Sequence, residues 1–208
     1  MSGGGERVIR TRDPFQQALE ALRLGLTLGR FVAGRPIVIA DEARGLGLST
    51  TPVREALCWL GGEGLVERGG AGGFFAPRLE PALIARQYAM RRLCLLQTEG
   101  PPIAAPPEGL IAGGTAADRL LATWRWRVRA LGDASLHAVF EAVQGRLVRF
   151  AAAEARLFPD VEAEAEALLA LPAGASAAAI ETYHERRILA APMLALSAES
   201  DSAPEAGT

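Results

Sequence analysis

The chain has 208 residues, half of them apolar and 22% charged, which suits a soluble globular protein of one large or two small domains. Its two cysteines are too few for a disulfide framework or a zinc site, and no stretch approaches the ~18 apolar residues of a membrane span. The formal net charge is −2 and all 22 basic residues are arginine, so a nucleic-acid surface would have to come from local placement of charge.

The first predicted helix begins at Pro14, whose missing amide proton needs no partner there, and Asp13 can cap it. Its apolar residues share one face: Phe15, Leu19, Leu22 and Leu26. Residues 1–13 are expected to form a flexible arm without the apolar run of a signal peptide, which indicates a cytoplasmic protein. Arg12 in this arm could contact DNA phosphates, although a solvated arm explains it equally well.

A short second helix is expected around residues 40–44 and a third over residues 52–60, with Thr51 as its N-cap and Pro52 at its first position. Val53, Leu57 and Leu60 recur at helical spacing and are expected in the core. The leading end then exposes four polar residues where such a helix enters a DNA major groove: Ser49, Thr50, Thr51 and Arg54. Capping for the threonines, and a salt bridge from Arg54 to Asp41, are the competing structural roles.

Two short strands, residues 65–68 and 74–77, follow the third helix and predict a hairpin. The residues between them are almost all glycine, and Gly72 is a candidate for close approach to the DNA backbone. Arg68 at the base of the hairpin is its candidate phosphate contact.

From residue 79 the pattern becomes helical throughout, apart from a proline- and glycine-rich loop over residues 100–114. The expected helices cover residues 81–97, 116–131, 134–157, 161–171 and 175–196. The sequence therefore predicts a mainly α protein with two domains, residues 14–78 and 79–197, followed by a disordered tail over residues 198–208.

The segment Leu46–Ser49, the run Thr51-Pro52-Val53-Arg54-Glu55-Ala56-Leu57 and the run Glu63-Gly64-Leu65-Val66-Glu67-Arg68 resemble motifs of the GntR family of transcription regulators. The later half is similar in helical layout to the FCD effector domain of its FadR-like subgroup. The resemblance implies a winged helix-turn-helix of three helices and a β-hairpin wing, followed by an all-helical bundle. It also implies a homodimer that binds a palindromic operator in double-stranded DNA.

Three departures from the family pattern stand out. Thr50 occupies a position where the family usually has a guanine-reading arginine, and the wing is nearly uncharged, so an altered operator is expected. Residues 120–126, where FCD domains often carry an Asp and a His as metal ligands, contain neither. We therefore expect no metal and no other cofactor.

Four residues of the helical domain are candidates for an anionic effector. Arg91 carries over from a family position that often points into the effector cavity, and His184 lies near the last histidine of the family's metal site. Arg125 and Arg129 are one helical turn apart and could grip a carboxylate together. The competing interpretation is a core stripe beside solvated arginines.

The sequence predicts a transcriptional regulator, most simply a repressor, that senses a small metabolite. The alternative is a winged-helix protein-interaction module that has lost specific DNA recognition. An enzyme is not expected, because no nucleophile, base and orienting group occur in a motif, and the glycine cluster lies between strands rather than before a helix.

Overall fold

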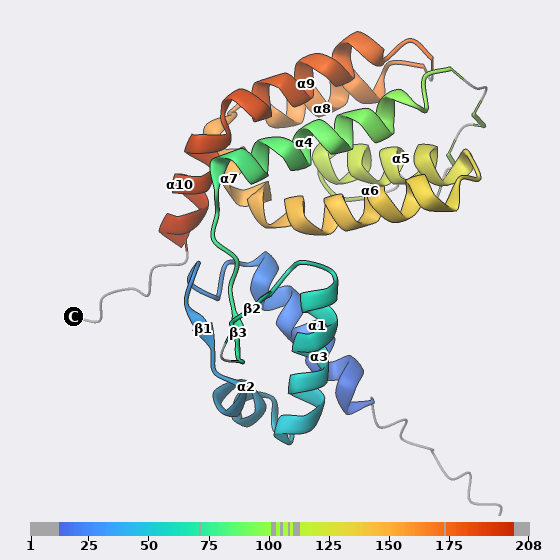
Figure 1. Cartoon of the computed structure of the whole chain (residues 1–208). Coiled ribbons are helices and arrows are strands. Elements are labelled where there is room, and N and C mark those ends of the chain that lie inside the picture. Colours follow the sequence, from blue (N-terminus) through green and yellow to red (C-terminus); the bar gives the residue numbers. More distant parts are fainter. Residues whose placement is uncertain are drawn as a thin grey trace, which may run out of the picture.

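A computed structural model describes residues 13–70, 72–100, 103–104, 106–107, 109, 113–172 and 174–201. It is mainly helical, with a small winged unit below a helical bundle (Figure 1). The first unit contains α1 (Pro14–Thr27), β1 (Pro36–Ile37), α2 (Ile39–Leu46), α3 (Thr50–Gly62), β2 (Glu67–Arg68) and β3 (Phe74–Phe75). The bundle contains α4 (Pro81–Leu96), α5 (Ala116–Ala130), α6 (Ala134–Leu147), a 3₁₀ turn (Val148–Phe150), α7 (Ala151–Leu157), α8 (Val161–Leu169), α9 (Ala177–Leu189) and α10 (Ala191–Asp201).

The winged unit is held together by α1 packed on α3. Leu22, Val53, Leu57 and Leu60 have no exposed surface, which confirms the predicted apolar faces of both helices. The Asp13 carboxylate accepts a hydrogen bond from the Phe15 amide, so the predicted cap of α1 is also confirmed. The packing of these buried residues holds α3 against α1 and so sets its position in the winged unit.

The sheet has three strands rather than the two of the predicted hairpin. β1 pairs antiparallel with β3 in the order β1-β3-β2, with Ile37 opposite Phe74. Ile37 and Phe74 are both buried, so the third strand closes the core beneath the wing. A strand of two residues, such as β1, is too short to show the alternation of apolar and polar residues by which a strand is predicted from sequence.

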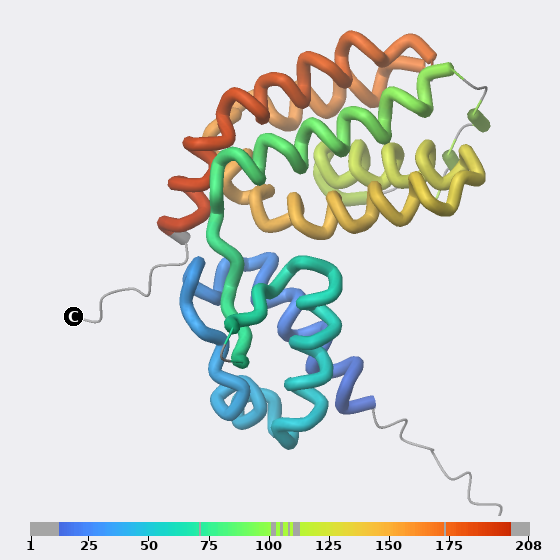
Figure 2. Tube along the Cα trace, viewed as in Figure 1, coloured from blue at the N-terminus to red at the C-terminus, as the bar shows by residue number. Residues whose placement is uncertain are grey.

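The bundle places α4 between α9 and α6, while α5 packs on α6 and α8. A single segment joins β3 to α4 (Figure 2), and Leu79 from this segment is buried in the bundle core with Tyr88, Phe150 and Leu194. A second core cluster, around Trp124, lies among α4, α5, α6, α8 and α9. Within the described residues, no helix is both long enough and apolar enough to cross a membrane.

Two predicted helices are each divided in the structure. The 3₁₀ turn separates α6 from α7, and α9 ends at Leu189 before α10 begins at Ala191. Pro192 explains the second break, since it cannot donate the amide bond that a continuous helix needs. α10 runs to Asp201, so the disorder expected from residue 198 is wrong for residues 198–201, and the remainder of that tail lies outside the described residues.

Candidate functional site: a nucleic-acid interface and a buried polar cluster

The leading end of α3 is built differently from the prediction. The helix begins at Thr50, not after a cap at Thr51, and Ser49 precedes it with an extended backbone. The Ser49 side chain makes no capping hydrogen bond, and Pro52 falls within the first turn, where its missing amide proton costs nothing. Among the described residues, the first-turn amides that remain therefore lack a cap from the Ser49 side chain, and amides at a helix N-terminus are oriented to meet an anion.

Arg54 is exposed one helical turn after Thr50, so the two side chains share a face of α3. No hydrogen bond or ion pair of Arg54 occurs among the described residues, and Thr51 beside it is exposed as well. Asp41, the competing partner, is 3.0 Å from Nη1 of Arg44 instead. The competing salt bridge is therefore not formed, and the Arg54 guanidinium remains available to a phosphate or a base.

The wing is anchored to α3 by its own arginine. Nη2 of Arg68 lies 2.8 Å from Sγ of Cys58, and the guanidinium lies 5.5 Å from the centroid of the Phe74 ring. Gly72 has φ +85°, a conformation that favours glycine, at the tip of the hairpin. The structure thus places Arg68 at the base of the wing and an uncharged tip beyond it. Arg12 lies outside the described residues.

The four candidate effector residues fall in two places. Arg91 and His184 meet in the bundle interior, where Nε of Arg91 donates to Nε2 of His184 at 3.1 Å. Arg125 is exposed and bonds Oε1 of Glu141 at 2.6 Å, and Arg129 is exposed one turn later on α5. The structure therefore brings together one predicted pair in the core and the other on the surface, not a single cavity.

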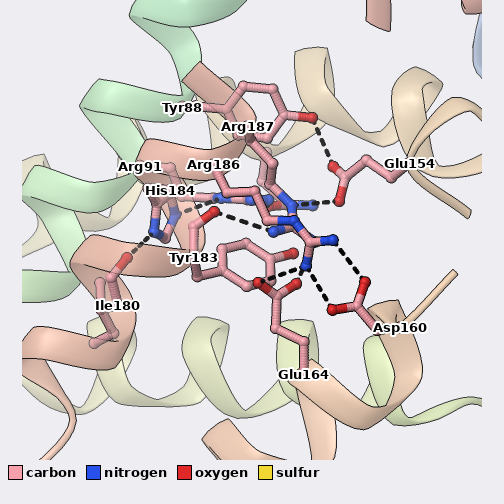
Figure 3. Close-up of polar contacts among 11 residues, drawn as sticks. Tyr88, Arg91, Glu154, Asp160, Glu164, Ile180, Tyr183, His184, Arg186 and Arg187 are labelled. Atoms are coloured by element: carbon pink, nitrogen blue, oxygen red, sulfur yellow. Dashed lines mark hydrogen bonds and ion pairs between the residues drawn. The ribbon is translucent and has the colours of Figure 1, made fainter. Parts of the chain in front are cut away.

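A cluster of charged side chains lies to one side of the Arg91–His184 pair (Figure 3). Arg187 has no exposed surface; its Nε lies 2.6 Å from Oε2 of Glu154, and its Nη2 lies 2.9 Å from Oε2 of Glu164. Tyr88 donates its hydroxyl to the other oxygen of Glu154 at 2.6 Å. Two carboxylates thus neutralise one buried guanidinium, which is the requirement for keeping a charge out of water.

Arg91 is held by neutral groups instead. Its Nη1 donates to Oε1 of Gln144 at 3.1 Å, and its Nη2 is buried and finds no hydrogen-bond partner in the described part of the chain. The guanidinium lies 5.2 Å from the Tyr88 ring centroid and 5.3 Å from that of Trp124. Aromatic faces attract a cation, so these rings replace part of the hydration energy that the guanidinium loses on burial.

Burial and the neighbouring Arg91 hold the pKa of His184 well below its usual range. Nδ1 lies 2.6 Å from the Ile180 carbonyl and Nε2 accepts from Arg91, so the ring is neutral with its proton on Nδ1. Burial and Glu154 raise the pKa of Tyr183 to about 12. His184 and Tyr183 are therefore both neutral near neutral pH.

This geometry does not suit a metal ion. His184 already uses both ring nitrogens, and one of them faces a guanidinium cation. Among the described residues, no three side chains of His, Cys, Asp or Glu are grouped so that they could hold a metal. The polar cluster occupies the bundle interior as a set of ion pairs and hydrogen bonds.

Sequence reasoning found Arg91 and His184 but missed Glu154, Glu164 and Arg187. The partners are far apart in sequence, on α7, α8 and α9, so no local spacing reports them. The one available signal is Tyr183 and Arg187 at i and i+4, which places Arg187 on the same face as a buried aromatic residue.

Comparison with known proteins relates the chain to regulators by fold. No protein-family model matches the sequence, and no curated protein matches it. A protein from Rhodococcus sp. RHA1, described as a candidate transcriptional regulator GntR, is similar over 86% of this chain and 97% of its own, with 18% identity and a TM-score of 0.68. The E. coli protein McbR/YncC is similar over 87% of this chain and 93% of its own, with 19% identity and a TM-score of 0.53. The expected fold, a winged helix-turn-helix followed by an all-helical bundle, is thus confirmed.

Proposed function

We propose that this chain, which has the fold of a GntR-type regulator, is a DNA-binding transcriptional regulator of that family. The observation that carries the proposal is Arg54, exposed and unpaired among the described residues, one turn from Thr50 on the leading end of α3. A helix of this kind enters the major groove with its N-terminal residues toward the bases. Ser49 and Thr51 would contact phosphates beside them, with Arg68, Gly72 and Arg12 following the backbone.

The finer parts of the proposal are a cytoplasmic homodimer, a palindromic operator and repression relieved by a small metabolite without a metal. The DNA-binding domain would cover residues 14–78 and the dimerisation domain residues 79–197. Two large apolar residues on one side of α4 support self-association, because each leaves roughly half its surface in water: Met90 43% and Leu93 51%.

The test of DNA binding is an electrophoretic shift with DNA from upstream of the chain's own gene, at low and moderate salt. We expect a shift that weakens as salt rises, because released counterions drive binding to phosphates. Arg54→Ala should weaken binding at both salt concentrations. The matched control is Arg129→Ala, an exposed arginine near the end of α5 in the bundle. Equal binding by both variants would contradict the proposal.

Self-association is tested separately by light scattering on the full chain. Leu93→Glu should shift the mass toward the monomer, because a charge would be buried in the interface. Val139→Glu on α6 is the control, since Val139 is exposed to a similar degree, 42%. A monomeric wild type would contradict the homodimer without bearing on the major-groove contact.

A second candidate function is protein docking by the winged unit. Trp59 near the end of α3 is 57% exposed and lies beside Phe15, with their ring centroids 6.0 Å apart. Exposed aromatic residues of this kind are typical of protein interfaces. Absence of any salt-sensitive binding to DNA, together with no effect of Arg54→Ala, would favour this alternative.

A further inference from the structure

A cavity of about 300 Å³ lies where the winged unit meets the bundle. It is lined by the start of the wing, the segment joining β3 to α4, and the facing parts of α4, α6 and the 3₁₀ turn. Apolar side chains form much of its wall: Leu65, Val66, Leu83, Ile84 and Phe150. Its size is at the lower end of ligand pockets, roughly 300–1,000 Å³.

Arginines reach the cavity from both sides. Arg146 is fixed, since its Nη2 donates to the Glu63 carbonyl at 3.0 Å. Arg149 makes no hydrogen bond or ion pair within the described part of the chain, although it is partly buried. Arg78, on the segment that joins β3 to α4, also lines the cavity and is exposed.

The charge of Arg149 is not balanced by the carboxylates nearby. Glu67 and Glu80 also line the cavity, but both are exposed to water and neither forms an ion pair with Arg149. Burial alone lowers the pKa of Arg149 from its ordinary value, with no carboxylate offsetting it. A desolvated cation beside an apolar wall is the arrangement that a carboxylate with an aliphatic body would complete.

We propose that this cavity binds a small aliphatic carboxylate, with the carboxylate on Arg149 and the chain against Leu83, Ile84 and Phe150. The site is separate from the Arg91–His184 cluster and uses none of its residues. Because its wall includes the first residues of the wing, a bound ligand would hold the winged unit against the bundle. That regulatory consequence, unlike the binding itself, rests on the proposed function in DNA binding.

Calorimetry on the full chain tests the binding, with octanoate as the probe and 1-octanol as the uncharged control. We expect saturable binding of octanoate and much weaker binding of octanol. Arg149→Gln should weaken octanoate binding by roughly tenfold, the loss expected for one charge-assisted hydrogen bond. Arg44→Gln, the same change of charge at an exposed arginine of α2 outside the cavity, should leave it unchanged.

A second variant tests whether weaker binding by Arg149→Gln comes from the lost charge and not from misfolding. Leu83 is 47% exposed, so Leu83→Glu should leave the fold intact while placing a negative charge in the cavity wall. We expect it also to weaken octanoate binding. The proposal is overturned if octanoate does not bind, if octanol binds equally well, or if both variants bind octanoate like the wild type.

The regulatory consequence has its own readout. Adding octanoate to the electrophoretic shift should change the DNA affinity of the wild type and not that of Arg149→Gln. A chain that binds octanoate but no DNA would contradict the proposed function and leave the site in place. A chain that binds DNA but no octanoate would do the reverse.

Discussion

Arg187 and Glu154 form an ion pair inside the bundle, with Nε and Oε2 2.6 Å apart and no exposed surface on the arginine. Glu154 also accepts the hydroxyl of Tyr88, so α4, α7 and α9 meet at one carboxylate. A buried pair of this kind adds little over an apolar pair of equal volume, but losing one partner leaves an uncompensated charge. The cluster therefore makes the bundle sensitive to single substitutions.

Glu154→Ala is accordingly expected to lower the free energy of unfolding by about 3–5 kcal/mol, because Nε of Arg187 and the hydroxyl of Tyr88 would both lose their acceptor in the bundle interior. Urea denaturation followed by circular dichroism measures the change. Glu181→Ala on the exposed side of α9 should cost less than about 0.5 kcal/mol. Equal midpoints for the two variants would mean that the Glu154–Arg187 pair is not needed.

His184 should give the stability a dependence on pH. Its pKa in the folded chain is well below the ordinary value of about 6.5, so below that pH the unfolded chain binds a proton that the folded chain refuses. The free energy of unfolding therefore falls as the pH drops from about 7 to 5. Above about pH 6.5 His184 is neutral in both the folded and the unfolded chain, so it no longer lowers the stability.

His184→Gln cannot titrate, so the stability gap between it and the wild type should narrow as the pH is lowered over that range. Urea midpoints at several pH values measure the gap. A gap that stays constant or widens at low pH would show that folding does not lower the pKa of His184.

Gly64 joins the end of α3 to the wing with φ +71°, and a Cβ there would lie 2.6 Å from Nη2 of Arg146. Gly64→Ala should therefore cost roughly 1–2 kcal/mol for the backbone and displace the arginine as well. Gly45→Ala is the control, because a Cβ at that helical glycine would have no other heavy atom of the described residues within 4 Å and alanine favours helix. The two variants should move the thermal midpoint in opposite directions.

Thr50→Arg tests the departure in the recognition helix. An arginine at this exposed position could make the bidentate contact to guanine that the family resemblance implies, worth roughly 1–3 kcal/mol of discrimination. Selection of bound sequences from a randomised operator should then show a new guanine preference. An unchanged preference would mean that residue 50 does not face the bases.

The parts of the fold that depend on near neighbours in sequence could be predicted. The Asp13 cap and the buried faces through Leu22 and Leu57 follow from spacing alone. The start of α3 could not, because Ser49 precedes the helix without the capping bond that usually marks such a position. The prediction chose Thr51 as the cap since it comes just before a proline.

Long-range pairing accounts for what remained hidden. β1 is only Pro36–Ile37 and exists because it pairs with Phe74–Phe75. Similarly, Gln144 meets Arg91 only after α4 and α6 pack together. For the candidate interface, exposure of Arg54 could be inferred from its helical position, while the bond of Arg68 to Cys58 required the fold.

The two neighbouring contacts of α6 constrain any attempt to exchange modules. Gln144 meets Arg91 in the bundle interior, while Arg146, two positions later, bonds the end of α3. A chimera that joined this bundle to a foreign winged unit would have to provide a free carbonyl and a glycine where Glu63 and Gly64 lie now. Grafts that keep the peptide around residues 63–64 should assemble, and those that cut between α3 and the wing should not.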